Sequence, residues 1–284
     1  MASLVEDAYA GLDKGDFATA RKLAEDIVGR SPADPDAHYI LALLQFDGGD
    51  RTAAVRHLET AITGRPGFAD ALSMLGLHFY QTGRNTEAEH YFRHAIDADD
   101  THVNAHLNLG NLFKETERYP AALTHIDAAL RSGYGIAQAH VLRGECLRAL
   151  DQSTDAFLAF KMAAAIDPNL FEAHFHLALL MTELRMFREA VSAFQDALIL
   201  RPDDDTCHKQ LGLCLLECGR FEDGLRELRR SSGFIEFTPA GNSLPRIIFG
   251  DEGDIVVDLM DLMENAIDPA AVIQEAKQTP YGGA

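Results

Sequence analysis

The chain has no tryptophan, only four cysteines and few basic residues, and it lacks long hydrophobic runs. The cysteines, Cys146, Cys207, Cys214 and Cys218, do not have the spacing of a disulfide framework, which predicts a reducing, cytoplasmic setting. No stretch approaches the roughly 20 apolar residues that cross a bilayer, so membrane insertion is not expected. The first twenty residues carry four acidic side chains and no apolar run, and no signal peptide is predicted.

Basic residues are scarce beside acidic ones: 25 against 44, which gives a formal net charge of −19. Residues 1–234 carry 35 acidic and 23 basic side chains, and the last fifty residues carry 9 and 2, so the net charges are −12 and −7. A chain of this charge repels polyanions, so neither nucleic acid nor an anionic membrane is an expected partner. Solubility explains such a charge in general. A basic or amphipathic cationic partner protein is the more specific interpretation.

Signatures of catalysis are also missing. The sequence has no glycine-rich phosphate loop, no Gly-x-Ser-x-Gly and no His-Glu-x-x-His. We therefore predict that the chain is not an enzyme and that it uses no cofactor.

The main feature that is present is a unit of 34 residues, which repeats seven times from residue 1 to about residue 234 without an insertion or deletion. Small residues recur at the same positions: Ala8, Ala42, Gly76, Gly110, Gly144, Ala178 and Gly212 in one series, and Ala20, Ala54, Ala88, Ala122, Ala156, Ala190 and Gly224 in another. A fixed period of this length is typical of stacked repeats, which present an extended surface rather than one pocket. The pattern favours binding over catalysis.

Each unit contains two helical patterns separated by a turn. In residues 69–102 the apolar stripes are Leu72, Leu75, Gly76 and Phe79, then Ala88, Phe92 and Ala95, with Gly83 between them. A glycine just past the first helix suits a left-handed C-terminal cap, and this position holds Gly15, Gly49, Gly83 and Gly219. A proline between units ends the second helix, as at Pro32, Pro66, Pro168 and Pro202. Small residues let the two helices of a unit approach closely.

These features resemble the tetratricopeptide repeat, and the resemblance covers about four-fifths of the chain. It rests on the small residue in the first helix, the turn with glycine and an aromatic residue, the two alanines of the second helix and the closing proline; the turn is seen in Gly15-Asp16-Phe17 and Gly219-Arg220-Phe221. Departures are local: Asp7 and Arg143 replace leucine, and Asp100 and Tyr134 replace the closing proline. The resemblance implies an all-α fold, a right-handed superhelical α-solenoid of tandem helix-turn-helix repeats.

The period predicts seven repeats within residues 1–234: 1–34, 35–68, 69–102, 103–136, 137–170, 171–204 and 205–234. Residues 235–284 are expected to form an acidic, non-repeat C-terminal extension. In it Ile255, Val256, Leu259, Met260, Leu262 and Met263 recur at helical spacing, and Asp268-Pro269 is typical of the start of a second short helix. The sequence leaves three roles open for this extension: capping repeat seven, occupying the protein's own groove, or docking on a partner.

If the fold of the family applies, the first helices line a concave groove and the second helices form its back. One face of each first helix packs inward, and the neighbouring face points into the groove. The predicted partner-binding residues are Tyr9, Tyr39, Leu43, Phe46, Leu77, Tyr80, Asn104, Asn108, Asn111, Lys114, Arg148, Phe175, Leu179 and Lys209, and the same face includes Val141 and Leu216. It is apolar at both ends and polar, partly basic, in the centre. Burial between helices is the alternative for any single residue, but contiguous apolar surface suits a peptide or an amphipathic helix.

Two specialised uses found in the family are matched only in part. Some members hold a C-terminal carboxylate with lysine, arginine and asparagine; Asn108, Asn111, Lys114 and Arg148 are the nearest approach, and the first clamp lysine has no counterpart. Others, such as the O-linked N-acetylglucosamine transferases, hold peptide backbone with a ladder of asparagines, of which this chain has only Asn108. Docking of a carboxylate near Lys114 and Arg148 is a hypothesis that rests on two cations in an acidic groove.

Histidines and cysteines invite a search for metal sites, but packing explains them better. His38, His106, His140, His174 and His208 recur at a position that the family usually fills with an aromatic packing residue. His90 and His94 lie four residues apart on one helix, without a third ligand in view. Cys207, Cys214 and Cys218 share one side of a helix and suit packing as small hydrophobic residues. We predict no metal site.

The sequence therefore predicts a cytoplasmic protein–protein interaction scaffold or adaptor that binds a peptide or helix of a partner protein in its groove. One alternative is a substrate-recognition subunit that works with a separate modifying enzyme, such as a glycosyl- or sulfotransferase. The other is a homo-oligomer, a self-assembling platform in which the extension of one chain enters the groove of the next.

Overall fold

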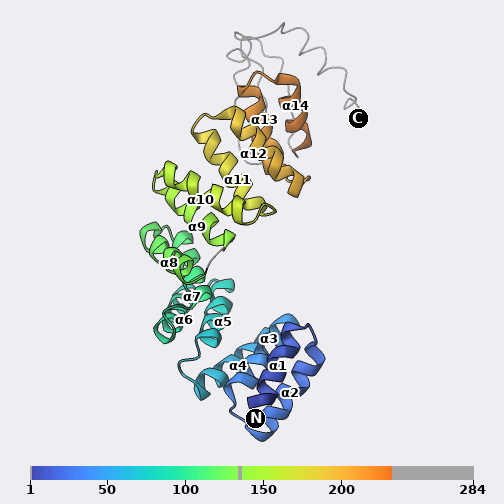
Figure 1. Cartoon of the computed structure of the whole chain (residues 1–284), viewed down its shortest axis with the longest axis vertical. Coiled ribbons are helices and arrows are strands. Elements are labelled where there is room, and N and C mark those ends of the chain that lie inside the picture. Colours follow the sequence, from blue (N-terminus) through green and yellow to red (C-terminus); the bar gives the residue numbers. More distant parts are fainter. Residues whose placement is uncertain (1, 134–135, 232–284) are drawn as a thin grey trace. The chain divides into compact units, whose positions relative to one another are not determined.

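The computed structural model describes residues 2–133 and 136–231 (Figure 1). These residues form fourteen α-helices joined by short turns. The chain divides into two compact units, residues 1–151 and 152–284. Within the described residues, the first unit holds helices α1 to α9 and the second unit holds α10 to α14.

Helices in both units follow the 34-residue period. Those of the first unit are α1 Ala2–Asp13, α2 Phe17–Arg30, α3 Pro35–Asp47, α4 Arg51–Gly64, α5 Ala69–Gln81, α6 Asn85–Ala98, α7 Val103–Glu115, α8 Tyr119–Ser132 and α9 Ala137–Ala149. Those of the second are α10 Ser153–Ile166, α11 Phe171–Glu183, α12 Phe187–Leu200, α13 Asp205–Glu217 and α14 Phe221–Arg230. Odd-numbered helices are the first helices of the repeats and even-numbered helices are the second helices.

Within each unit, helices pack first in pairs and then from one pair to the next. In the first unit α1 packs on α2, α3 on α4, α5 on α6 and α7 on α8, and each second helix also packs on the first helix that follows it. In the second unit the same holds for α11 with α12, α13 with α14, and α12 with α13. Phe92, Phe113 and Phe194 are among the largest side chains that are fully buried between these helices. Burial of a side chain of this size stabilises the fold by about 1.5–3 kcal/mol.

Glycines of the first small-residue series lie where the two helices of a repeat approach closely. A Cβ atom on Gly76 would lie 2.7 Å from Cδ1 of Phe92, and one on Gly110 would lie 2.8 Å from Cγ1 of Ile126. At Gly212 the corresponding distance to Cγ of Leu228 is 2.6 Å. Real carbon atoms do not approach this closely in a packed interior. Glycine is therefore required at these positions as long as the facing side chain stays this large.

The turn between the two helices of a repeat contains one residue in the left-handed region, as the sequence predicts for its glycines. The residues with φ between 73° and 82° are Gly15, Gly49, Gly83 and Gly219. In repeats four to six the same position holds Glu117, Asp151 and Arg185, with φ of 58–59°. A left-handed conformation costs a residue with a side chain roughly 1–2 kcal/mol. The turns of repeats four to six thus have the same backbone conformation as the glycine turns, although this conformation is locally unfavourable for their residues.

The all-α architecture of tandem helix pairs that the sequence predicts is confirmed by these helices. The expected C-terminal extension, with its short helices after residue 253, lies outside the described residues. Among the helices that the structure describes, none is long and apolar enough to span a bilayer.

Candidate partner-binding surface

Eleven of the predicted partner-binding residues lie on first helices of the first unit. They are Tyr9 on α1; Tyr39, Leu43 and Phe46 on α3; Leu77 and Tyr80 on α5; Asn104, Asn108, Asn111 and Lys114 on α7; and Arg148 on α9. Asn104 is exposed and the other ten are partly exposed, so none of them is buried. We call this set the first-helix face. α1 packs directly on α3, α5 on α7 and α7 on α9, and the ring contact of Phe46 with His78 links α3 to α5.

Aromatic side chains anchor the N-terminal part of the first-helix face. The ring of Tyr39 lies 5.0 Å from that of Phe68, and Phe46 lies 6.0 Å from His78 on the next first helix. Tyr9, Leu77 and Tyr80 are likewise packed in part against the hydrophobic core. Each side chain is therefore held in place by its buried side, while its other side provides apolar surface for a partner.

The predicted placement of Val141 and Leu216 in the groove is wrong, because these side chains are only 1% and 3% exposed. Leu216 turns toward the second helix of its own repeat: a Cβ atom on Gly224 would lie 2.8 Å from Cδ2 of Leu216. Six of the seven repeats have alanine where Gly224 stands, so the missing methyl group leaves room for this inward packing.

Carboxylates from the neighbouring repeat lie close to the tyrosines of this face. The hydroxyl of Tyr9 donates to Oδ1 of Asp36 at 3.3 Å, and Asp36 is in turn paired with Arg65. Burial, together with the nearby charge of Asp70, raises the pKa of Tyr39 to about 12. Both tyrosines consequently stay protonated, and Tyr9 acts as a hydrogen-bond donor toward its acidic neighbour.

Tyr80 shows the same arrangement at the border with the polar centre. Its hydroxyl donates to the carboxylate of Glu115 and accepts a hydrogen bond from Nδ2 of Asn111 at 2.8 Å. Burial and the bond to Glu115 raise the pKa of Tyr80 above its usual value of 10. Three predicted partner-binding residues, Tyr9, Tyr80 and Asn111, thus belong to hydrogen bonds that link one repeat to the next.

Charge is distributed unequally between the first and second helices of repeats one to three. The first helices α1, α3 and α5 contain six acidic residues, Glu6, Asp7, Asp13, Asp36, Asp47 and Asp70, and no lysine or arginine. The second helices α2, α4 and α6 carry six acidic and six basic residues, so their charges balance. The N-terminal part of the first-helix face is therefore acidic as well as aromatic.

The centre of the face contains cations that already have acidic neighbours. Nζ of Lys114 on α7 lies 3.0 Å from Oε2 of Glu145 on α9, and both side chains are about one-fifth exposed. Glu145 also precedes Arg148 by one helical turn. An incoming carboxylate would have to compete with Glu145 for Lys114. The structure therefore gives less support to a carboxylate site at Lys114 and Arg148 than the sequence does.

The remaining three predicted residues lie in the second unit. Phe175 and Leu179 on α11 are partly exposed and pack against the core formed with α12 and α13. The ring of Phe175 is stacked on Phe171 at 5.4 Å and meets Phe194 edge-on at 6.0 Å. Lys209 on α13 is partly exposed. This group has two apolar members, Phe175 and Leu179, whereas α1, α3 and α5 carry six of the predicted residues.

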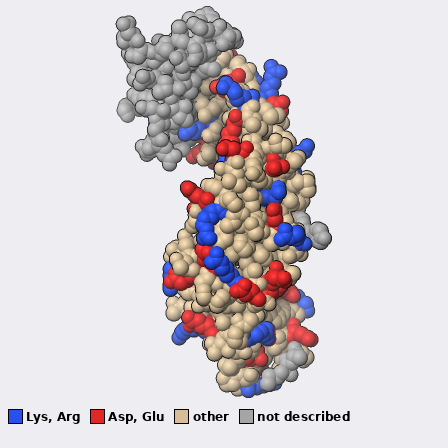
Figure 2. Space-filling model, turned by 90° about the vertical axis from the view of Figure 1, so that its left-hand side faces the viewer, with Lys and Arg blue, Asp and Glu red and all other residues tan. Residues whose placement is uncertain are grey.

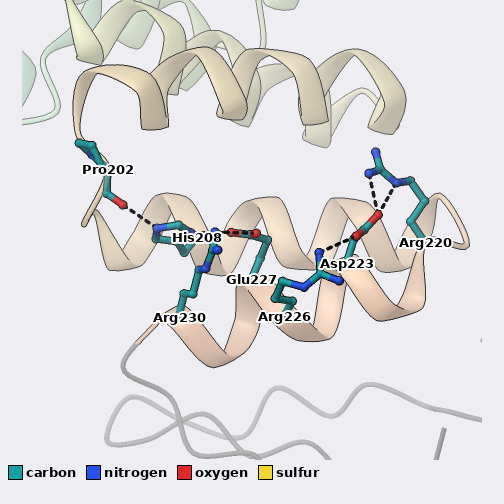
Figure 3. A network of polar contacts seen from close by, with 7 residues as sticks. All are labelled: Pro202, His208, Arg220, Asp223, Arg226, Glu227 and Arg230. Atoms are coloured by element: carbon teal, nitrogen blue, oxygen red, sulfur yellow. Dashed lines mark hydrogen bonds and ion pairs between the residues drawn. The ribbon is translucent and has the colours of Figure 1, made fainter. Parts of the chain in front are cut away.

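The recurring histidines have structural roles that their spacing did not reveal. Figure 3 shows His208 held between the carbonyl of Pro202, at 2.8 Å from Nε2, and Glu227, whose Oε2 lies 2.7 Å from Nδ1. Glu227 also pairs with Arg230 at 3.1 Å. The imidazole thereby joins the turn before α13, α13 itself and α14.

Repeats two and four contain the same bridge with a second histidine in place of the glutamate. Nε2 of His38 lies 2.9 Å from the carbonyl oxygen of Pro32, and its Nδ1 lies 2.8 Å from Nδ1 of His57. Nε2 of His106 lies 3.1 Å from the carbonyl oxygen of Asp100, and its Nδ1 lies 3.1 Å from Nδ1 of His125. In all three bridges the partners lie six residues before and nineteen residues after the central histidine.

Metal ligation finds no support in the described part of the chain. No three histidine, cysteine, aspartate or glutamate side chains there are arranged to hold an ion. Cys207 and Cys214 are buried in the core around α12 and α13, and burial raises the pKa of Cys207 to about 12, so its thiol stays protonated. His90 and His94 are exposed on α6, with ring centroids 4.1 Å apart.

Charged side chains of both signs alternate over the face shown in Figure 2, with apolar and neutral surface between them. No large continuous basic patch is visible in that view. Proteins that bind nucleic acid have a basic patch or stripe on their surface, and this face does not show one.

A family model described as tetratricopeptide repeat matches residues 7–50, 42–103 and 107–170, which together make up more than half of the chain. The chain belongs to the tetratricopeptide repeat family. Membership of this family supports a general role as a protein-interaction scaffold. No curated protein sequence matches this tetratricopeptide repeat protein significantly.

Solved structures with the same fold extend the comparison. YrrB, described as a TPR protein with an unusual peptide-binding site, is 21% identical and aligns over 61% of this chain and 90% of its own, with a TM-score of 0.53. PilF of Pseudomonas aeruginosa is 16% identical over 72% of this chain and 92% of its own, with a TM-score of 0.64. A chain of the APC/C hetero-tetramer Cut9–Hcn1 is 17% identical over 75% of this chain and 42% of its own, with a TM-score of 0.65. At these identities the likeness concerns the fold alone.

Acidic residues of the surface are what sequence reasoning missed. Asp36, Asp70 and Glu115 lie next to tyrosines of the first-helix face, although 27 to 35 residues separate Asp36 and Glu115 from theirs. The absence of lysine and arginine from residues 2–13, 35–47 and 69–81 is a signal in the sequence that could have drawn attention to Asp36 and Asp70, but not to Glu115.

Proposed function

We propose that this protein is an interaction scaffold that binds a cationic, amphipathic segment of a partner protein on the first-helix face of its first unit. The observation that carries the proposal is the combination found on α1, α3 and α5: partly exposed aromatic and aliphatic side chains, six acidic residues, and no lysine or arginine. Apolar residues of the partner would pack on Tyr39, Phe46 and Leu77, and its lysines or arginines would meet the carboxylates. Arginine and lysine also bind favourably to the faces of aromatic rings.

A binding assay with synthetic peptides tests the chemistry of the partner directly. Two labelled amphipathic peptides of about 14 residues, about 21 Å long as helices, share their leucines and differ only in carrying lysine or glutamate on the polar face. We expect the lysine peptide to bind the full chain at low salt, about 50 mM, and binding to weaken as salt is added, because the charges are exposed. Equal binding of both peptides would show that charge does not select the partner.

Charge-reversal variants test the location. Asp13 and Asp47 lie one helical turn after Tyr9 and Leu43, on the same side of α1 and α3, and both are exposed. Changing both to lysine should weaken binding of the lysine peptide about tenfold, which corresponds to about 1.4 kcal/mol.

A matched control changes the net charge equally on second helices. Asp26 on α2 and Asp97 on α6 are also exposed, and Asp26→Lys with Asp97→Lys alters the total charge by the same amount. This variant should bind within about twofold of the original protein, because its changes are remote from the proposed surface. If both variants lose affinity alike, the attraction comes from the whole acidic chain and the first-helix face is not the site.

A further inference from the structure

We propose that the pairs His38–His57 and His106–His125 are acid-sensitive latches that loosen repeats two and four at mildly acidic pH, whereas the His208–Glu227 bridge keeps repeat seven closed. Each latch joins three segments: the turn before a first helix, the first helix itself and the second helix of the same repeat. The response of each latch to acid depends on which nitrogen of each imidazole carries a proton.

The backbone carbonyl determines the tautomer of the central histidine, that is, which ring nitrogen carries the hydrogen. Because the carbonyl oxygen of Pro32 can only accept, Nε2 of His38 must carry the hydrogen of that bond. In neutral His38 the other nitrogen, Nδ1, is then an acceptor, so the hydrogen between the two rings belongs to Nδ1 of His57. The same reasoning makes Nδ1 of His125 the donor to His106.

Each pair can take up one proton without losing a contact, but not two. The first proton can bind to Nε2 of His57, which leaves its Nδ1 donating to His38. A second proton has only Nδ1 of His38 to bind, and two N–H groups would then face each other across 2.8 Å. The inter-ring hydrogen bond is lost at that point, and like charges repel at short range.

The groups around His57 and His125, the second histidines of the two pairs, disfavour binding of the first proton as well. Burial, the neighbouring His38 on α3 and Arg56 on α4 lower the pKa of His57. Burial, His106 on α7 and Arg93 on α6 lower the pKa of His125 to about 4, although Glu89 on α6 acts in the opposite direction.

Asp99, in the turn after α6, is a further charged group that interacts with the His106 side. An added proton on His106 would have only the engaged Nδ1 to bind, whatever charge lies beside it. One neighbouring carboxylate therefore does not relieve the conflict between the two rings.

The dependence on pH follows in sign from these lowered values. An unfolded histidine titrates near 6.5, so below that pH the open form of a repeat binds more protons than the closed form. The latch is therefore fully effective above about pH 6.5, and its contribution is lost as the pH falls toward the folded value, about 4 for His125. For each excluded proton, the equilibrium constant for opening rises about tenfold per pH unit in this interval.

Repeat seven contains the opposite arrangement. His208 donates to the carbonyl of Pro202 through Nε2, and its Nδ1 faces a carboxylate that can only accept while it is ionised. A protonated His208 has a hydrogen for both contacts, so mild acid leaves this bridge intact. Repeat seven is thus an internal control, because it has Glu227 where repeats two and four have His57 and His125.

Loosening of repeats two and four would act on the binding surface, a consequence that rests on the proposed function. α3 carries Tyr39, Leu43 and Phe46, and α7 carries four polar residues of the first-helix face. Acid would thereby release a bound partner by displacing the helices that hold it.

Hydrogen exchange of the full chain measures the latches without any partner. After correction for the intrinsic effect of pH on exchange, amide protection in α3–α4 and α7–α8 should fall about tenfold between pH 7 and pH 5.5, and that in α13–α14 should not. Failure of peptide binding would contradict the proposed function and leave this result standing.

Exchange of the partner residues between repeats is the decisive variant. His57→Glu with His125→Glu gives repeats two and four the bridge of repeat seven, and should abolish their acid sensitivity. Glu227→His gives repeat seven a histidine pair and should create the sensitivity there. An acid response that ignores these changes, or that is equal in all repeats, overturns the proposal.

A measurement on the unaltered chain guards against variants that do not fold. Nuclear magnetic resonance follows the titration of each imidazole. Each pair should titrate in two separated steps, with the second step below the usual range. If His38, His57, His106 and His125 all titrate independently near 6.5, the pairs are not latches.

Discussion

Single residues carry much of the difference between otherwise equal repeats. The position after each first helix is left-handed in all seven repeats, but only four of them use glycine there. Glu117, Asp151 and Arg185 adopt the same conformation because the packed helices on both sides fix the path of the turn. The geometry of a repeat is thus set by its packing, and a residue that disfavours the conformation is tolerated at a cost.

Replacing a strained residue by glycine should stabilise the protein. We expect Arg185→Gly to raise the free energy of unfolding by about 0.5–1 kcal/mol, since the left-handed penalty is larger than the entropic cost of glycine. Urea denaturation followed by circular dichroism measures the difference. Gly83→Ala is the reverse control and should destabilise by a similar amount. A destabilising Arg185→Gly would show that the side chain contributes more than its backbone strain costs.

Helices of this protein are defined by the pairs they form rather than by their own sequences. Asp16 and Asp50 cap α2 and α4 by accepting hydrogen bonds from Thr19 and Ala53, whereas α6, α8, α10, α12 and α14 have no such side-chain cap. All seven second helices nevertheless begin 34 residues apart. Tertiary packing of the small-residue faces therefore sets the start of the second helix in the repeats that lack a capping residue.

Contact between paired helices makes one glycine critical and another dispensable. Gly76→Ala should destabilise the chain by about 1–3 kcal/mol, because the new methyl group would overlap the ring of Phe92. Gly29→Ala on α2 meets no atom within 4 Å, so it should stabilise the helix by about 0.5–1 kcal/mol. Thermal unfolding of both variants tests the pair. Equal effects of the two changes would mean that helix propensity outweighs the close approach.

Contacts along the chain run between neighbouring repeats within each of its two units. A cavity in one repeat should therefore act locally. Phe92→Ala removes a fully buried ring from repeat three and should cost about 3–5 kcal/mol there. Hydrogen exchange should show loss of protection in α5, α6 and the adjoining helices, with α13 and α14 unchanged. Uniform loss along the chain would indicate a single cooperative unit instead.

Sequence predicted the fold at this scale because the period, the small-residue series and the turn glycines all depend on local contacts. It also identified side chains of the first-helix face that the structure leaves partly exposed, such as Tyr39, Phe46 and Tyr80. It did not reveal the bonds from Tyr9 to Asp36 or from Tyr80 to Glu115, which join different repeats. Nor did it reveal the histidine pairs, because they require the relative rotation of two helices. Val141 and Leu216 were misplaced for the same reason.

Successive second helices begin 34 residues apart, so the chain can gain or lose one whole repeat without changing the spacing of the others. The start of α5 at Ala69 and that of α7 at Val103 occupy the same phase, and so do those of α6 and α8. Excision of residues 69–102 would therefore join repeat two to repeat four at equivalent positions, without a shift of phase. The two latched repeats would then become direct neighbours. Removal or insertion of one repeat would therefore change both the length of the binding surface and the distance between the two histidine pairs by one repeat.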